Sequence, residues 1–254
     1  MGALHRGHAS LIERAGKLAD SSGTVIVSIF VNPTQFGPGE DFSRYPRTFP
    51  ADRELCAAAG ADAVFYPAPA EVYPEDFSTY VEEQQVSLPL CGGSRPGHFR
   101  GVCTVVMKLF LIVQPDLAVF GRKDFQQCAV IARMVRDLNV PVRLVLAETV
   151  REPDGLALSS RNTYLSEEER AQAPIIRRAF LDSLSAFRRG ERRAATLRRQ
   201  IERQIASASL ARIDYIEIVD GASLQPVRKV TRGCVVAGAV FFGRTRLIDN
   251  LEFR

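Results

Sequence analysis

Residues 24–31 read TVIVSIFV, and this stretch decides the fold. It is rich in β-branched side chains and almost wholly apolar, which is typical of a strand buried on both faces of a parallel sheet. Residues 6–20, just before it, place their apolar side chains on one helical face and predict an amphipathic helix. A helix leading into a fully buried strand favours an α/β protein.

Helix and strand patterns go on alternating through the first half of the chain. The predicted helices cover 50–59, 104–113 and 124–138, and the predicted strands cover 63–66, 117–120 and 142–150. This alternation predicts βαβ units in a Rossmann-like, doubly wound parallel sheet.

The pattern changes after about residue 150. Ser166 and Glu169 have the spacing of a capping box and predict the start of a long helix that ends near Arg189. A second helix is expected at 194–208, followed by strands at 214–219, at 233–242 and near Leu247. We therefore expect two domains, residues 1–149 with the parallel sheet and residues 150–254 forming a smaller α+β lid domain.

Composition limits the classes of protein that remain. The 254 residues are 46% hydrophobic and 24% charged, which excludes a disordered chain, a coiled coil and a collagen. The net charge of +4 and the absence of a basic stripe predict no nucleic-acid partner, and no apolar run is long enough to predict a membrane span. Five scattered cysteines without a CxxC pair favour a reduced, cytoplasmic compartment.

The first candidate site is His5-Arg6-Gly7-His8, an HxGH motif at the start of the first predicted helix. Two imidazoles three residues apart share one helical face, and Gly7 allows a close approach to the backbone. Unpaired N–H groups at a helix N-terminus attract anions, so the motif predicts a phosphate site. The competing interpretation is a pair of surface histidines.

Two further candidate segments follow predicted strands. Residues 32–37, NPTQFG, carry amide side chains suited to a polar, uncharged substrate edge. Residues 120–127, FGRKDFQQ, lie at the carboxyl end of a predicted parallel strand, where open α/β sheets bind ligands. Lys123 is one of only four lysines in an arginine-rich chain, Asp124 is placed to accept from a ribose hydroxyl, and Gln127 lies one helical turn on. A solvated helix face is the alternative for Gln127.

Two loops add cationic and hydroxyl groups. Residues 94–101, SRPGHFRG, could clamp a carboxylate or phosphate or could be a solvated turn. Residues 158–162, LSSRN, combine two hydroxyls with a guanidinium near Gly155, which is suited to phosphate. Their position at the expected domain boundary fits either a closing lid or a simple linker.

Taken together, the motifs resemble the pantoate–β-alanine ligase family. The segments MGALHRGH, SIFVNPTQFG, YPRT, SRPGHFRGV, VQPD, FGRKDFQQ and DGLALSSRN stand in the family's order, and LIDN extends the resemblance towards the C-terminus. HxGH alone marks a whole nucleotidyltransferase superfamily, whereas the set is specific. The resemblance implies that ATP and (R)-pantoate form pantoyl adenylate and pyrophosphate, and that β-alanine then gives pantothenate, a coenzyme A precursor, and AMP.

The resemblance also implies roles for single residues. His8 would be a proton donor, and His5 and Lys123 would act on the phosphates. Gln35 and Gln127 would bind pantoate, with Gln35 also reaching the β-alanine region. Mg²⁺ would enter on the ATP phosphates with no protein ligand assigned, and the chain would form a homodimer through its first domain. The residues implied to bind ATP are Met1, Gly2, Ala3, Leu4, His5, Arg6, Gly7, His8, Gly121, Arg122, Lys123, Asp124, Val150, Leu158, Ser159, Ser160 and Arg161.

Two alternatives remain open from the sequence. One is another HxGH nucleotidyltransferase, such as a cytidylyltransferase or phosphopantetheine adenylyltransferase, and the other is an inactive, N-terminally truncated copy. In the family, a strand precedes the HxGH helix, and no residues for it precede Met1. We therefore expect that Met1 is an internal methionine and that the natural chain starts some tens of residues earlier, so that the first strand of the sheet is missing.

Overall fold

The computed structural model describes residues 2–20, 22–37 and 39–254. By its internal contacts the chain divides into two compact units, each assembled from three segments. Unit 1 comprises Met1–Ser87, Arg95–Arg122 and Gln127–Val150. Unit 2 comprises Leu88–Ser94, Lys123–Gln126 and Arg151–Arg254. The division into domains at residue 149 stays a prediction.

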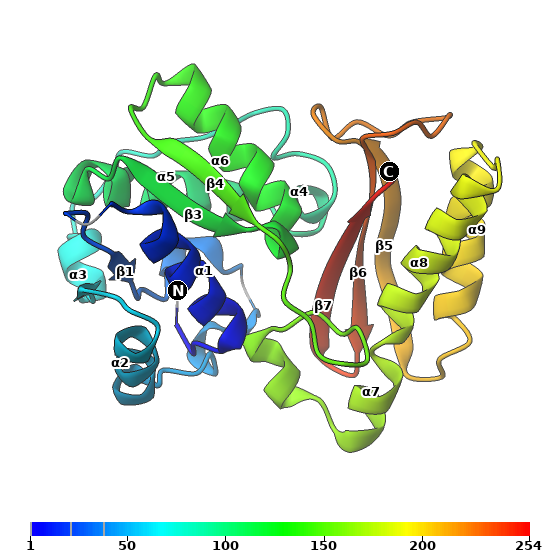
Figure 1. Ribbon diagram of the computed structural model, residues 1–254, viewed down its shortest axis with the longest axis horizontal. Coiled ribbons are helices and arrows are strands. Elements are labelled where there is room, and N and C mark those ends of the chain that lie inside the picture. The colour runs from blue at the N-terminus through cyan, green and yellow to red at the C-terminus, as the bar shows by residue number, and fades with distance from the viewer. Residues whose placement is uncertain (1, 21, 38) are drawn as a thin grey trace. The chain divides into compact units, whose positions relative to one another are not determined.

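Unit 1 is an α/β unit built around two pairs of parallel strands (Figure 1). In its first half, the elements are α1 (Arg6–Leu18), β1 (Ile26–Ser28), η1 (Pro33–Gln35), η2 (Asp41–Ser43), α2 (Phe49–Ala58), β2 (Ala63–Phe65) and α3 (Pro69–Val72). The later elements are α5 (His98–Val113), β3 (Leu117–Gly121), η3 (Arg122–Asp124), α6 (Phe125–Asp137) and β4 (Arg143–Ala147). Within them, residues Lys123–Gln126, which end η3 and begin α6, belong to unit 2.

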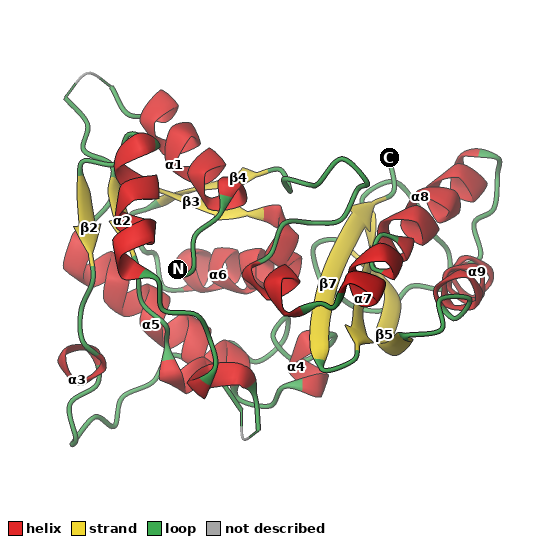
Figure 2. Cartoon of the chain, turned by 90° about the horizontal axis from the view of Figure 1, so that it is seen from below, coloured by secondary structure: helices red, strands yellow, loops and turns green. Residues whose placement is uncertain are grey.

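The parallel pairing confirms the expected α/β class. Val27 pairs with Val64 in β1–β2, and Val119 pairs with Val145 in β3–β4. Within the described ranges the two pairs do not join into one sheet, because no strand hydrogen-bonds to both of them. Figure 2 shows α1 and α6 on opposite sides of the β3–β4 pair, which is the layered arrangement of a doubly wound fold.

The strand predicted at 24–31 is shorter and more open than expected. Only Ile26–Ser28 pairs with β2, and the Ile26 side chain is exposed while Val27 is buried. The prediction of burial on both faces is therefore wrong for Ile26. The apolar residues that flank β1 still join its core, where Val25 and Ile29 pack with Ile12 of α1.

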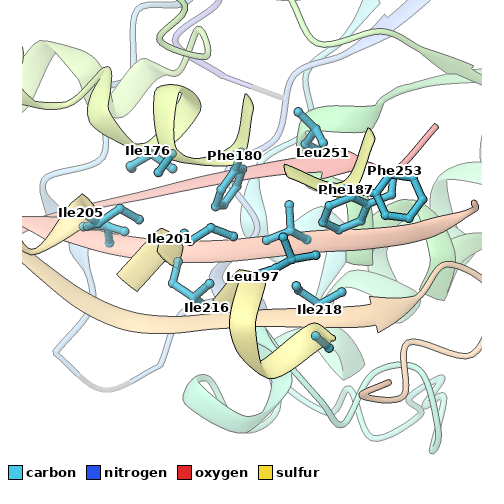
Figure 3. Close-up of a cluster of buried hydrophobic side chains, with 14 of the residues drawn as sticks. Ile176, Phe180, Phe187, Leu197, Ile201, Ile205, Ile216, Ile218, Leu251 and Phe253 are labelled. Carbon is cyan, nitrogen blue, oxygen red and sulfur yellow. The ribbon is translucent and has the colours of Figure 1, made fainter. Parts of the chain in front are cut away.

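Unit 2 is an α+β unit with one three-stranded antiparallel sheet in the order β5-β6-β7. Its remaining elements are α4 (Cys91–Ser94), η4 (Ser160–Tyr164), α7 (Glu167–Gln172), α8 (Ile175–Arg188), α9 (Ala194–Ile205), β5 (Ala211–Asp220), β6 (Cys234–Phe242) and β7 (Thr245–Glu252). The side chains of α8 and α9, including Phe180 and Leu197, are buried against the sheet, where they join Ile218 of β5 in one core (Figure 3). Burial of apolar area on this scale is the main stabilising term of such a unit.

The long helix predicted from 166 to 189 is in fact two helices. The Ser166–Glu169 capping box forms as predicted. The helix stops at Gln172, however, and α8 starts at Ile175, because Pro174 has no N–H to continue the ladder.

Candidate active site

The two histidines of the HxGH motif cap the helix that they begin. His5 is the N-cap of α1, and its Nδ1 accepts from the Gly7 N–H at 3.1 Å. Nδ1 of His8 accepts from the His5 N–H at 3.2 Å, and the two ring centroids are 4.1 Å apart. Because both Nδ1 atoms are acceptors, each neutral ring carries its proton on Nε2. The pair therefore consists of two Nε2–H donors of fixed tautomer.

This capping corrects the expectation that the helix starts with unpaired N–H groups. The Gly7 N–H bonds to the ring of His5, and the N–H groups of His8 and Ala9 bond to the His5 carbonyl at 2.7 and 3.1 Å. The capping box satisfies donors that an uncapped helix would leave for a ligand. Anion binding at this motif would therefore rest on the imidazoles.

A buried carboxylate that the sequence reading missed holds the backbone in front of this helix. Asp52, only 3% exposed, accepts from the N–H groups of Ala3 and Leu4 at 3.0 and 2.7 Å and from the Thr48 hydroxyl at 3.0 Å. Ala3 has a φ of 49°, a conformation that needs such support in a residue other than glycine. An acidic residue in the first turn of a predicted helix was the available signal, and it does not reveal a partner 49 residues away.

Asn32 and Gln35, both expected to face substrate, have different roles. Asn32 is buried, and its Oδ1 accepts from the Thr34 and Tyr73 hydroxyls, each at 2.9 Å. Its Nδ2 donates to the Gly101 carbonyl at 3.0 Å and to Oε1 of Gln35 at 3.3 Å. The prediction that the Asn32 amide binds substrate is therefore contradicted, because the fold uses both of its polar atoms. Gln35 ends η1 and is only partly buried.

The loop predicted at 94–101 is only a short turn, because α5 begins at His98, and Arg95 in this turn clamps a carboxylate of the protein itself. Arg95 donates from Nε to Oε1 of Glu40 at 2.7 Å and pairs through Nη2 with Oε2 at 2.5 Å. The same Nη2 and Nδ1 of His98 both approach the Gln35 carbonyl oxygen, at 3.2 and 2.8 Å. Nε2 of His98 lies 3.1 Å from the Arg95 guanidinium, so it must be the acceptor and Nδ1–H the donor.

This network fixes the backbone of Gln35 and sets the ionisation of Glu40. Burial alone would raise the pKa of the Glu40 carboxyl, but the hydrogen bond and charge of Arg95 outweigh it and lower the pKa below its usual range.

The segment 121–127 contributes to both units. Gly121 and Arg122 belong to unit 1, where Arg122 pairs with Glu148 at 3.3 Å. Gln127 also belongs to unit 1 and is half-buried on α6. Lys123 and Asp124 belong to unit 2, with Nζ of Lys123 at 3.6 Å from the Asp124 carboxylate.

Unit 2 brings two of the predicted phosphate ligands together. Lys123 and Ser159 line one cavity, and Asn250 of β7 holds the Lys123 carbonyl at 3.0 Å. Ser159 is also the N-cap of η4 and accepts from the Arg161 N–H at 3.3 Å. The other predicted residues of this loop, Leu158, Ser160 and Arg161, adjoin Ser159 in the chain, and Val150 ends the last segment of unit 1.

The remaining predicted ligands precede or begin α1. Gly2, Ala3 and Leu4 lie in the segment before it, and Arg6 is exposed in its first turn. Met1 lies outside the described residues.

Gln126, the neighbour of Gln127, has a structural role that the sequence did not reveal. It is 6% exposed and accepts from the Cys91 N–H at 2.9 Å, while its Nε2 donates to the Pro89 carbonyl at 2.6 Å. The two adjacent glutamines therefore divide into a buried clamp and a half-buried candidate ligand.

Comparisons with known proteins identify the family of the chain. The family model described as pantoate-beta-alanine ligase matches residues 1–252. The pantothenate synthetase of Moorella thermoacetica is 55% identical over 251 residues, which covers 99% of this chain and 88% of the relative. That of Thermotoga petrophila is 53% identical over 250 residues, covering 98% and 88%.

Solved structures give the same result. A pantothenate synthetase from Thermus thermophilus matches with a TM-score of 0.95 and 48% identity, covering all of this chain and 91% of that one. A pantoate-beta-alanine ligase from Francisella tularensis, solved with "Beta-gamma ATP" and β-alanine, matches with a TM-score of 0.78 and 33% identity, covering 100% and 87%. A match along the whole chain does not favour a different HxGH nucleotidyltransferase. The chain therefore belongs to the pantoate–β-alanine ligase family.

Proposed function

We propose that the chain condenses pantoate with β-alanine at the expense of ATP, in two steps. In the first, a pantoate carboxylate oxygen attacks the α-phosphorus of ATP, which forms pantoyl adenylate and expels pyrophosphate. In the second, the β-alanine amine attacks the acyl carbon, the acyl–phosphate bond breaks, and pantothenate, AMP and a proton are released. Adenylation is required because a carboxylate is a poor electrophile. The family match over residues 1–252 carries this proposal.

In this proposal the HxGH pair handles charge that develops on phosphate. The helix cap fixes the Nδ1 atoms of His5 and His8. The Nε2–H donor on the other side of each ring is therefore held in place as well. Donors held in advance at the place where charge develops lower a barrier without reorganisation. His8 would donate a proton in the adenylation step, and His5 would bind phosphate beside it.

The other assignments follow the motifs. Lys123 would bind phosphate and Asp124 the ribose, while Ser159, Ser160 and Arg161 would bind the phosphate chain. Met1–Leu4, Arg6, Gly7, Gly121, Arg122, Val150 and Leu158 would complete the nucleotide contacts. Gln35 and Gln127 would bind pantoate, with Gln35 also near β-alanine.

Mg²⁺ would enter as part of the substrate, on the phosphates of ATP. In the described part of the chain, no three His, Cys, Asp or Glu side chains come together as a metal site. The proposal assigns no step to the ion.

The same proposal includes a homodimer, a two-domain division at residue 149 and a cytoplasmic location. In unit 1, Leu111 and Ile112 of α5 are 66% and 53% exposed, and adjacent exposed apolar side chains are suited to a partner surface. None of the helices in the described ranges is long and apolar enough to cross a membrane.

The proposed function is tested by following AMP and pyrophosphate with purified protein. We expect pyrophosphate release to require ATP and pantoate, and AMP formation to require β-alanine in addition. Pyrophosphate release that is independent of pantoate, or AMP formation that is independent of β-alanine, would contradict the two-step reaction.

A further inference from the structure

Unit 2 contains a cavity whose polar lining goes beyond the recognised motifs. Its empty volume is about 300 Å³, the mouth included, and the enclosed part has room for about one water molecule. Lys123 and Ser159, already candidate phosphate ligands, line it together with Asn162, Arg177 of α8 and Asp249 of β7. Arg177 lies outside every motif identified in the sequence.

The charge in this cavity is positive. Asp249 is the only acidic side chain among its lining residues within the described chain, and it is 5% exposed. Arg151 neutralises it through two hydrogen bonds of 2.8 Å. Lys123 and Arg177 therefore supply two positive charges beyond this pair, and Asp124, which is 46% exposed, lies 3.6 Å from the lysine.

Arg177 has no protein group among the described residues that binds its charge. Its guanidinium forms no hydrogen bond or ion pair with any other described residue. Burial and the charge of Arg151 both lower the pKa of Arg177, against an opposing effect of Asp249. Arg177 is partly buried, and the five donors of its guanidinium are available to an anion.

A second polar group that lines the cavity also has an unpaired atom. Oδ1 of Asn162 is buried and accepts from no described residue. Its orientation is fixed, because Nδ2 donates to the Ala157 carbonyl at 3.0 Å. This oxygen can accept a hydrogen bond from a group that enters the cavity.

Gly155 leaves room for the side chain of Arg177. Its φ is +93°, and a Cβ there would stand 3.2 Å from Cγ of Arg177. The Gly155 carbonyl in turn accepts from Arg151 at 3.0 Å. The turn that carries the DGLALSSRN motif therefore supports the stem of Arg177.

We propose that Arg177 is a further phosphate-binding residue, which with Lys123 and Ser159 forms a subsite for the pyrophosphate portion of ATP. A point-like ammonium, a guanidinium fork and a hydroxyl suit an anion with several oxygens and more than one negative charge. A carboxylate would use one of the two cations and leave the other uncompensated. This inference rests on the proposed function, in which pyrophosphate is the leaving group.

The test compares Arg177→Gln with Arg178→Gln in the full-length chain. Arg178 follows on the same helix and is exposed, so its variant controls for the loss of one charge from α8. Binding of inorganic pyrophosphate and of AMP is measured by calorimetry, and pantoate-dependent ATP–pyrophosphate exchange is measured at several pyrophosphate concentrations. Arg177→Lys, which keeps the charge but not the fork, is the conservative variant.

We expect Arg177→Gln to weaken pyrophosphate binding about tenfold or more, with AMP binding unchanged, since AMP lacks these phosphates. Arg178→Gln should bind both like the wild type, and Arg177→Lys should fall between. Unchanged pyrophosphate affinity in Arg177→Gln would overturn the inference, as would an equal loss for AMP or the same loss in Arg178→Gln. If the wild type shows no pantoate-dependent exchange, the proposed function fails, while the calorimetry still decides whether Arg177 binds pyrophosphate.

Discussion

At the scale of single residues, each histidine of the HxGH motif uses its two ring nitrogens differently. Nδ1 of His8 accepts from the His5 backbone at 3.2 Å, which stabilises the first turn of α1 and fixes the proton on Nε2. Substituting His8 therefore removes both a cap and a donor. The two effects are separable, because another side chain with an acceptor atom at its δ position can keep the cap without supplying the donor.

We predict that His8→Ala lowers kcat for pyrophosphate release about 10²–10⁴-fold while KM for ATP changes far less, since a proton donor acts in the transition state. The variant should also lose about 0.5–2 kcal/mol of stability with its cap. His8→Asn keeps an acceptor near the Nδ1 position, so it should lose kcat without the stability loss. Pyrophosphate release by either variant at the wild-type rate would exclude His8 from the chemistry.

Glu40 should make stability depend on pH in the acid range. Arg95 holds the folded-state pKa of Glu40 below its ordinary value of 4.5. A lowered folded-state pKa contributes stability above the unfolded-state pKa, and that contribution is lost as pH falls through the folded-state value. Glu40→Gln should therefore melt at a lower temperature than the wild type at pH 7, and the difference should shrink below about pH 4.5. A difference in melting temperature that stays constant from pH 7 to pH 3 would contradict this role.

At the scale of elements, the packing of α5 against η1 depends on one missing methyl group. A Cβ on Gly101 would stand 2.4 Å from the Thr34 carbonyl oxygen and 2.8 Å from the Gln35 nitrogen. Both atoms are backbone, so the helix or the η1 turn would have to move. The position of Gln35, a candidate pantoate ligand, therefore depends on the position of α5.

We predict that Gly101→Ala costs about 1–3 kcal/mol of stability through overpacking and raises KM for pantoate more than KM for ATP. Gly16→Ala is the matched control, because Gly16 is also helical and a Cβ there meets nothing within 4 Å. That variant should stabilise α1 by up to about 1 kcal/mol. Thermal unfolding and substrate-dependent kinetics measure both effects, and a neutral Gly101→Ala would show that α5 and η1 tolerate displacement.

Sequence periodicity was sufficient for most elements, because it reports local burial. It predicted α1, β3, α9 and the Ser166 cap, which depend on neighbouring side chains. It failed where a partner is distant: the clamp between Asp52 and Ala3 joins residues 49 apart, and the Arg95–Glu40 pair joins residues 55 apart. The sequence therefore identified the candidate ligands but not the side chains that hold them.

At the scale of the whole molecule, the same limit applies to the division into units. The short segments Leu88–Ser94 and Lys123–Gln126 pack with unit 2, although their neighbours along the chain belong to unit 1. Sγ of Cys91 lies 3.2 Å from the Tyr215 hydroxyl, and the Lys123 carbonyl accepts from Asn250. These partners lie more than a hundred residues away in sequence, beyond the reach of any local pattern.

The exposed apolar pair on α5 gives a prediction for the assembly. Leu111 and Ile112 are both more than half exposed, so their apolar surface stays in contact with water unless a partner covers it. Covering this surface would be favourable. We expect the wild type to sediment as a dimer and Leu111→Lys/Ile112→Lys as a monomer, because two buried lysines per protomer would be unpaired charges. Leu88→Lys is the control, since Leu88 is 63% exposed in unit 2 and should leave the dimer intact. A monomeric wild type, or a double variant that still sediments as a dimer, would remove α5 from the interface.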